Sequence, residues 1–493
     1  MSLATTSSAR RRPGFAFEAV APAAPDALPR MDVPLFAGIA ARGPLQVPVV
    51  VEDLAQFVGR FGGPAPLVLD AARGEPVTAQ LHAAVALFFA GGGRRCAVLR
   101  VAHAEPLAEA SRFAVPGVLA LRQADDGAAV AGELLLRAAS PGRWADGLLV
   151  AGSLEVDRAL PLAVALSELR LQPAGTADWV AGDLLRLSWP GLVAHVGVAA
   201  VVRPAPGSGA PLGLGLQAPW WVATEGSPGG FGRLLALPPG LPTVERLRLT
   251  LWWREGGVVR RLAGLGLAPG HPRHLAALPD DAALDARPDA HVGAEPEAAA
   301  TLRRRWPDAL VPRAPLAGLG PDTATWCLPL AVAAQPLVWS EARHSGRAAI
   351  ERDGLVPWTA ALWADPALIA SPASTLAADA EGLRVLSRQP RALTGLHAAW
   401  GLDEISLLAV PDAVWPGWVL QPLPLPEPPP AAPPAAPTAA GFAACEPAAP
   451  AAPQPARRPG APAAPVWQLA PATAGVAGRA TLLAVQRLAL RCV

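Results

Sequence analysis

Val33-Pro34-Leu35-Phe36-Ala37-Gly38-Ile39-Ala40 is an uninterrupted apolar run, and it ends at a turn formed by Arg42-Gly43-Pro44. A second short apolar run follows at residues 47–51, and a third occupies residues 96–101. Apolar runs of four to eight residues bounded by turn residues are typical of buried strands. We therefore expect strands here that are covered by other elements.

Two helical patterns lie between these runs. Glu52 and Asp53 stand where acidic residues favour a helix N-terminus, and Gly62-Gly63 ends the first pattern. The second pattern covers residues 78–90 and ends at Gly91-Gly92-Gly93. The residues expected to point inward are Leu54, Phe57, Val58 and Phe61 in the first helix, and Leu81, Val85, Phe88 and Phe89 in the second. Helices alternating with apolar strands predict an α/β layer. The stretch contains no recognisable catalytic or ligand-binding motif.

This stretch also carries a resemblance. The order DVPLFAGIAARGPLQVPVVVEDLAQFVGRFGG at residues 32–63, followed by LHAAVALFFAGGGRRCAVLRVA at residues 81–102, resembles the N-terminal signature of contractile tail sheath proteins. Such proteins occur in phage tails, tailocins and extracellular contractile injection systems. The resemblance implies a structural subunit, assembled in the cytoplasm, that stacks in hexameric rings around an inner tube and contracts to drive it. Its implied partners are further copies, the tube protein, sheath paralogues and baseplate proteins.

Composition limits the chemistry of the chain. Of its 493 residues none is Lys, Asn or Tyr, so a Lys-dependent phosphate loop, a Schiff-base lysine and a catalytic tyrosine are excluded. A formal net charge of +1 predicts no broad attraction to nucleic acid or anionic lipid. The four cysteines form no CxxC pair, and no apolar run is long enough to span a bilayer. We expect a soluble protein without membrane insertion.

The N-terminal segment, residues 1–30, is rich in Ala, Pro, Ser and Arg and predicts an extended arm. It contains one candidate strand, which the resemblance implies to be an inter-subunit strand; a disordered tail is the alternative from the sequence alone. The candidate residues are Phe15, Ala16, Phe17, Glu18, Ala19 and Val20.

Residues 31–112 and 266–419 are predicted to form two segments of an α/β core, a mixed sheet with flanking helices. Between them, residues 113–265 show short strands separated by Pro and Gly, which predicts an inserted, mainly antiparallel β domain. Its clearest strand is 246–254, where Leu247, Leu249, Leu251 and Trp253 alternate with polar residues before a hairpin at Gly256-Gly257.

Further phrases that resemble the family lie at residues 111–121, 139–150, 264–281, 326–332, 350–358 and 393–410. In the last of these, Ile405, Leu407 and Leu408 are expected to form a buried strand, and the resemblance implies that this strand shares the core with residues 96–101. In the phrase at 139–150, Ser140-Pro141-Gly142 predicts a turn and Trp144 a core anchor.

The C-terminal part is dominated by Pro and Ala. Residues 420–475 predict a semi-rigid polyproline II linker, and residues 476–493 the opening of a helix. The apolar stripe of that helix (Leu482, Val485, Leu488, Ala489 and Cys492) needs a partner surface. Sheath proteins continue beyond such a helix, so the resemblance implies that a C-terminal part is missing or supplied by a second polypeptide. We then expect the chain alone not to form tubes.

Candidate chemistry is sparse. Gly91-Gly92-Gly93 follows a helix and precedes a strand, the reverse of a phosphate-binding turn, so we interpret it as a helix cap. His271 and His274 are close in sequence, but no further ligands sit at metal-site spacing, and a loop packed on the core is the preferred interpretation. His82, His195 and His397 sit among apolar residues, and the 16 tryptophans are either core residues or interface anchors. We therefore name no catalytic, cofactor-binding or metal-binding residue.

Two alternatives stay open from the sequence. One is a baseplate or cap adaptor built on the same fold. The other, more remote, is an α/β enzyme, which would require a pocket with converging titratable groups.

Overall fold

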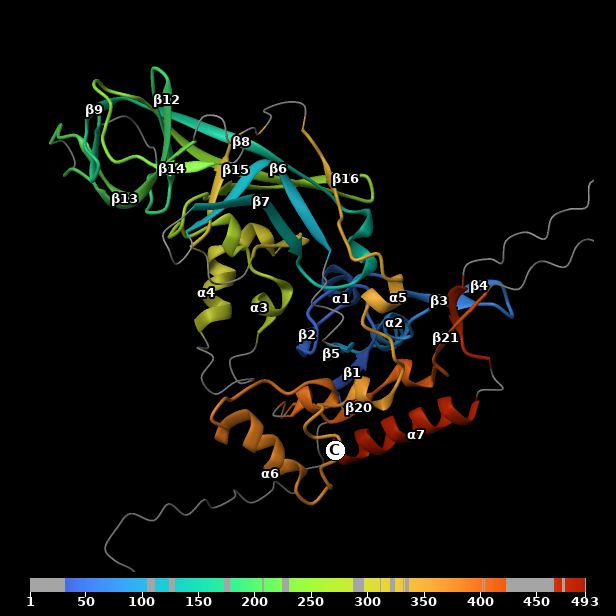
Figure 1. Ribbon diagram of the computed structural model, residues 1–493. Coiled ribbons are helices and arrows are strands. Elements are labelled where there is room, and N and C mark those ends of the chain that lie inside the picture. Colours follow the sequence, from blue (N-terminus) through green and yellow to red (C-terminus); the bar gives the residue numbers. More distant parts are fainter. Residues whose placement is uncertain are drawn as a thin grey trace, which may run out of the picture.

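The structure is a computed structural model. It describes residues 32–103, 111–123, 129–172, 178–205, 208–223, 230–286, 297–310, 312–319, 324–330, 332, 337–400, 402, 404–422, 465–471 and 475–492. The expected mixture of α and β structure in several sheets is confirmed, with strands more abundant than helices (Figure 1). The N-terminal arm, with its candidate strand from Phe15 to Val20, lies outside the described residues.

A four-stranded mixed sheet contains the apolar runs that open the chain. Its order is β2 (Val49–Val51), β5 (Cys96–Arg100), β1 (Pro34–Gly38) and β20 (Leu407–Ala409). Strand β1 is parallel to both β5 and β20, whereas β2 is antiparallel to β5. Segments more than 300 positions apart in the chain thus lie side by side in one sheet.

Both faces of this sheet are covered, which explains why its strands lack polar alternation. On one face Phe36 and Val98 pack against helices α1 (Leu54–Phe61) and α2 (Leu81–Ala90). On the other face Leu35 and Leu99 belong to a second cluster, which also receives the C-terminal helix. Successive side chains of β1 and β5 therefore point alternately into one apolar cluster and into the other, rather than alternately into the core and into solvent.

The first predicted helix has the expected ends. Asp53 is its N-cap and accepts a hydrogen bond from the Gln56 amide at 2.6 Å, and Gly62, with φ 81°, donates its amide to Val58. Phe57 and Phe61 are buried as expected, but Val58 is 37 % exposed. One of the four residues predicted to point inward therefore faces solvent.

A ten-stranded antiparallel sheet makes up most of the remaining structure. Its main order is β19 (Ser340–Glu341), β8 (Leu149–Ala159), β15 (Thr243–Glu255), β11 (Leu184–Trp189), β12 (Leu192–Val202), β13 (Leu212–Ala223), β10 (Glu168–Leu171) and β9 (Pro161–Val164). Strands β14 (Phe231–Arg233) and β16 (Val258–Leu265) pair with β13 and β15. The expected hairpin at Gly256-Gly257 joins β15 to β16, and Leu247, Leu249, Leu251 and Trp253 are buried together.

This sheet must curl. Only Leu160 separates β8 from β9, yet five strands lie between these two strands in the sheet order. The far edge of the sheet therefore returns to the end of β8, and Figure 1 shows the curled part with β9, β12 and β13. An apolar cluster fills its interior, with Leu169, Leu187, Val196 and Trp220 among its members. We call this part the curled sheet.

A smaller antiparallel sheet has the order β17 (Leu316–Ala317), β7 (Ala129–Ala138), β6 (Arg112–Gln123) and β18 (Trp326–Pro329). Strands β17, β18 and β19 come from residues that the sequence assigns to the second core segment. The antiparallel sheets therefore contain strands from beyond residue 265. Hydrophobic pairing explains this placement, because Trp326, Cys327 and Leu328 pack in the same cluster as Phe113 and Leu136.

The fourth sheet connects the C-terminal residues to the beginning of the chain. Its order is β21 (Trp418–Pro422), β22 (Pro465–Leu469), β3 (Pro66–Asp70) and β4 (Glu75–Thr78). Both β22 and the last residues of β21 lie in the range predicted as a Pro/Ala-rich linker. Residues 423–464 of that range lie outside the described residues.

Helix α7 (Gly475–Cys492) finds its partner surface within this chain. Val485 and Leu488 are buried in the cluster beneath the mixed sheet, with Leu482 and Ala489 packed around them. Arg491 donates to the backbone carbonyl of Ser371 at 3.0 Å. The stripe was predicted to need a partner surface, and the second face of the mixed sheet supplies one (Figure 1).

Short helices complete the fold. They are α3 (Asp281–Asp285), α4 (Glu297–Arg305), α5 (Ala349–Arg352) and α6 (Leu376–Glu381), with 3-10 segments at Arg143–Gly147, Leu275–Ala277, Pro307–Ala309, Ala360–Trp363, Gly395–Ala399 and Pro411–Val414, and a π turn at Gly382–Leu386. The predicted buried run Ile405, Leu407 and Leu408 is wrong for Leu407, which is 41 % exposed because β20 is an edge strand.

Candidate functional site: the joint and the buried aspartate network

Two reciprocal ion pairs join the phrase at residues 139–150 to the phrase at 350–358. The Arg143 side chain and amide both contact Asp353, at 2.5 Å and 2.8 Å. Three residues further along, Asp146 accepts two hydrogen bonds from Arg352, at 2.6 Å and 2.7 Å. One segment contributes Arg143 and Asp146 and the other contributes Arg352 and Asp353, so each segment carries one positive and one negative charge. We call this contact between the mixed sheet and the antiparallel sheets the joint.

Arg100 lies beneath the joint at the end of β5. Its side chain is almost fully buried and donates to the carbonyls of Gly43, at 2.9 Å, and Pro141, at 2.8 Å. Burial lowers the pKa of Arg100 to about 10, while Asp353 and Asp281 oppose that change. The guanidinium therefore keeps its charge at neutral pH. The Ser140 hydroxyl accepts the Gly43 amide at 2.9 Å, so the turn predicted at Ser140-Pro141-Gly142 is fixed to the first turn of the chain.

A cavity of about 280 Å³ adjoins the joint. Its lining includes Arg100, Arg143, Trp144 and Asp353 among apolar residues. The charged groups are already engaged: Arg100 and Arg143 donate to backbone carbonyls, and Asp353 accepts from Arg143. The arrangement is chemically a rigid connection rather than a set of groups poised for reaction.

A second network surrounds Asp183, whose side chain is fully buried. Arg248 donates to its carboxylate at 2.9 Å and 3.3 Å, the Val180 amide donates at 2.9 Å, and Nε2 of His271 lies 3.6 Å away. Burial alone raises the pKa of Asp183, but the contacts from His271, Arg248 and the Val180 amide outweigh it and hold the pKa below its ordinary value. The carboxylate is therefore charged at neutral pH.

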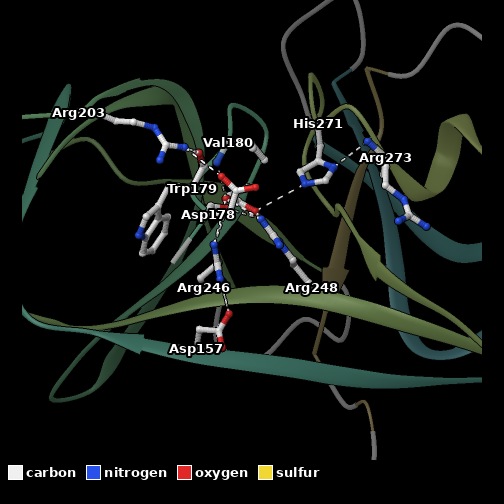
Figure 2. A network of polar contacts seen from close by, with 10 residues as sticks. Asp157, Asp178, Trp179, Val180, Arg203, Arg246, Arg248, His271 and Arg273 are labelled. Atoms are coloured by element: carbon white, nitrogen blue, oxygen red, sulfur yellow. Dashed lines mark hydrogen bonds and ion pairs between the residues drawn. The ribbon is translucent and has the colours of Figure 1, made fainter. Parts of the chain in front are cut away.

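Arg246 extends this network toward the curled sheet. Figure 2 shows Arg246 and Arg248 reaching toward the loop that carries Trp179, while His271 approaches from the other side. Arg246 pairs with Asp157 at 2.6 Å, and its guanidinium stacks 4.8 Å from the centre of the Trp179 ring. On β15 both arginines share a face with Val244, which packs inside the curled sheet. The network thus closes one end of that apolar interior.

Two glycines allow the close approach of His271. A Cβ at Gly182, where φ is +81°, would lie 1.9 Å from the His271 amide nitrogen, and a Cβ at Gly266 would lie 2.0 Å from the His271 ring. His274 is held separately, with its two ring nitrogens 3.2 Å and 2.8 Å from the carbonyls of Gly266 and Thr325. The two predicted histidines are therefore packed into the core, as the preferred interpretation held.

The other glycine, aspartate, histidine, tryptophan and cysteine residues considered for function have structural roles. Gly91 caps α2 by donating to Leu87, and Asp280 caps α3 by accepting the Ala283 amide. His195 and His397 are buried, and all 16 tryptophans are buried or partly buried. Burial raises the pKa of both Cys96 and Cys327 to about 12, so these thiols are unreactive near neutral pH. Among the residues that the structure describes, no group of three or more His, Cys, Asp or Glu could hold a metal ion.

Sequence reasoning missed Arg100, Asp183 and Asp412. Asp412 is fully buried after β20, where it accepts the Ile39 amide at 2.8 Å and the Gln80 amide at 2.6 Å. An arginine inside an apolar strand was a usable signal for Arg100. The aspartates carried no signal, because Arg248, the charged partner of Asp183, lies 65 positions away and Ile39, a partner of Asp412, lies 373 positions away.

The predicted inter-subunit strand from Phe15 to Val20 cannot be placed, since it lies outside the described residues. No described helix is long and apolar enough to cross a membrane. No protein-family model matches the chain, and no curated protein matches it.

Proposed function

We propose that this chain is a structural subunit of a contractile tail sheath, of the kind found in phage tails and contractile injection systems. Under this proposal subunits stack as hexameric rings around an inner tube, and sheath paralogues and baseplate proteins are further partners. Under the same proposal the subunit assembles in the cytoplasm as part of a phage tail-like particle. The proposal assigns the chain no catalytic activity and no cofactor.

One observation carries the proposal: the separate phrases that resemble sheath proteins meet in space. The first run (β1), the strand at 96–100 (β5) and the strand at 407–409 (β20) are neighbours in the mixed sheet. The phrases at 139–150 and 350–358 meet at the joint through reciprocal ion pairs. These phrases lie far apart in the sequence, and their meeting in one sheet and at one contact supports a shared architecture.

Assembly also requires surfaces for neighbours, and a short strand with free backbone groups is one such surface. In the described part of the chain β20 pairs only with β1, so its outer edge is unpaired. Leu407 is exposed on this strand. An arm that adds a strand gains main-chain hydrogen bonds at low cost, which is the role we propose for residues 15–20.

The test is co-expression of the chain with the products of its neighbouring genes, followed by negative-stain electron microscopy. We expect rings and tubes. A variant with Ala16→Pro and Ala19→Pro removes two amide donors while keeping the arm's length, and it should yield folded subunits without rings. The matched control, Ala4→Pro with Ser7→Pro, should assemble normally.

Each result has a defined meaning. Tubes formed by the arm variant would overturn the role of the arm. Rings that never stack would favour a baseplate or cap adaptor, and the absence of any ordered assembly with every neighbour would overturn the sheath proposal.

A further inference from the structure

Three arginines stand in one row across the start of strand β6. Arg112 pairs directly with Arg137 of β7 on one side and with Arg343 on the other. Directly opposite residues of antiparallel strands project from the same face, about 5 Å apart, and like charges in that arrangement repel one another. Two of the three charges are compensated: Arg137 pairs with Asp280 at 2.7 Å, and Arg343 pairs with Glu133. Among the described residues, the Arg112 side chain has no hydrogen bond or ion pair.

The row lies at one end of a trough on the outer face of β6 and β7. The trough has a volume of about 450 Å³, and Ala120 and Gly132, which pair with each other, form part of its floor. Arg122 stands toward its other end, where it donates to the Thr325 hydroxyl at 3.0 Å. Within the described residues no carboxylate lies at ion-pair distance from Arg122.

The dimensions fit an extended segment. Val130 pairs with Arg122 and Arg137 pairs with Arg112, so the two basic ends are separated by the length of β7 from residue 130 to residue 137. At the rise of a strand this is about 23 Å, the length of roughly seven extended residues. Glu133, the acidic residue of the lining, is already engaged by Arg343, so among the described residues no carboxylate compensates the arginine at either end of the trough.

We propose that this trough binds an extended segment of about seven residues from a partner protein, with a carboxylate at each end of the segment, one for Arg112 and one for Arg122. The positive charge of the lining favours an acidic segment. The small residues Ala120 and Gly132 in the floor leave room for the backbone of that segment. In the free protein the positive charge of Arg112 is repelled by the neighbouring charges of Arg137 and Arg343. A carboxylate from the partner would offset this repulsion. This inference is independent of the sheath proposal and holds for any assembly that contains the chain.

The test measures binding of labelled heptapeptides to the full chain by fluorescence anisotropy at low salt. The probe is Glu-Ser-Val-Gly-Val-Ser-Glu, and a peptide of the same composition with both glutamates adjacent at the centre controls for spacing. We expect the first peptide to bind at least about tenfold more tightly, because only it reaches both arginines with charge-assisted contacts. Equal binding of both peptides would overturn the proposal.

Variants locate the binding and separate it from folding. Arg112→Glu and Arg122→Glu should each weaken the first peptide by about tenfold or more, whereas Arg305→Glu, an exposed charge on α4, should not. Arg112→Gln should lose binding with an unchanged or higher melting temperature, since it removes repulsion. A fall in melting temperature would assign Arg112 a structural role and contradict the proposal, as would self-association of the chain that the peptide does not displace.

Discussion

Asp183 beside the curled sheet and Asp412 beside the mixed sheet are both fully buried aspartates with opposite electrostatics. Asp183 faces Arg248, and its pKa lies below the ordinary value. Asp412 accepts backbone amides and contacts Trp415, and there burial outweighs those hydrogen bonds and raises its pKa. At Asp183 the contacts from His271, Arg248 and the Val180 amide outweigh the loss of hydration of the carboxylate, whereas at Asp412 the hydrogen bonds from backbone amides and Trp415 do not.

The two aspartates also serve different kinds of architecture. Asp183 closes the end of a sheet built largely of consecutive hairpins, whereas Asp412 connects β1, α2 and the residues after β20, which are hundreds of positions apart in the chain. At the curled sheet, an ion pair between Asp183 and Arg248 therefore stabilises one end of the sheet. At the mixed sheet, the Asp412 side chain joins elements that are distant in the sequence.

The largest effect is expected from Asp183→Ala. Removing this carboxylate leaves Arg248 and the mostly buried Arg246 without their central anion, and breaking a buried ion pair costs about 3–5 kcal/mol. Urea unfolding should show the loss. Asp178→Ala is the control, because that side chain is exposed, and an equal loss for both variants would contradict the role given to Asp183.

Asp412→Ala should have the next largest effect. It leaves the amides of Ile39 and Gln80 without an acceptor, and each such group costs about 1–3 kcal/mol. Hydrogen exchange should report opening of β1 and of the start of α2 before the curled sheet opens. Asp412→Asn keeps one acceptor oxygen and should recover part of the loss; a uniform increase in exchange would refute the local role.

The pH dependence of stability should separate the two aspartates. The pKa of Asp183 is lowered, so its contribution is present above the ordinary value of 3.8 and is lost as pH falls through its folded value. The pKa of Asp412 is raised, so its contribution is present below 3.8 and is lost as pH rises through its folded value. The test is the urea concentration at the unfolding midpoint, measured between pH 3 and pH 7. In Asp183→Asn the midpoint should fall less at the acid end than in the unchanged protein. In Asp412→Asn the midpoint should no longer decline above pH 4. Identical profiles would contradict the comparison.

The joint should show a smaller, pairwise effect. A double-mutant cycle on Arg143→Ala and Asp353→Ala should give a coupling free energy of about 0.5–3 kcal/mol, since these side chains are partly shielded from solvent. Arg170 and Glu168 form an exposed pair at 3.0 Å and provide the matched control, expected below about 1 kcal/mol. A coupling no larger at the joint than on the surface would mean that apolar packing holds the two parts together.

The smallest effect is expected from Leu407→Ser. Because Leu407 is exposed on an edge strand, the substitution should change the free energy of unfolding by no more than about 0.5 kcal/mol. The corresponding Leu35→Ser, on the adjacent strand, should be severely destabilising, because Leu35 is fully buried. A large effect at Leu407 in chemical denaturation would show that the edge is covered in solution.

Periodicity located much of the local structure. The caps at Asp53 and Gly62, the hairpin at Gly256-Gly257 and the buried face of β15 followed from spacing and turn chemistry. What spacing could not show was which distant segments meet. The packing surface of α7, the strand at 465–469 and the partners of Asp183 and Asp412 depend on contacts across the fold, to which a single sequence gives no direct clue.

The pairing of β21 with β22 makes Pro422 and Pro465 direct neighbours. The segment between them therefore begins and ends at one point on the surface, and the pairing of its two ends sets no particular length for it. Loop-closure entropy changes by only about 0.6 kcal/mol for each doubling of length. We therefore expect that a segment of another length, or a foreign domain, can take the place of residues 423–464 while β21 and β22 stay paired.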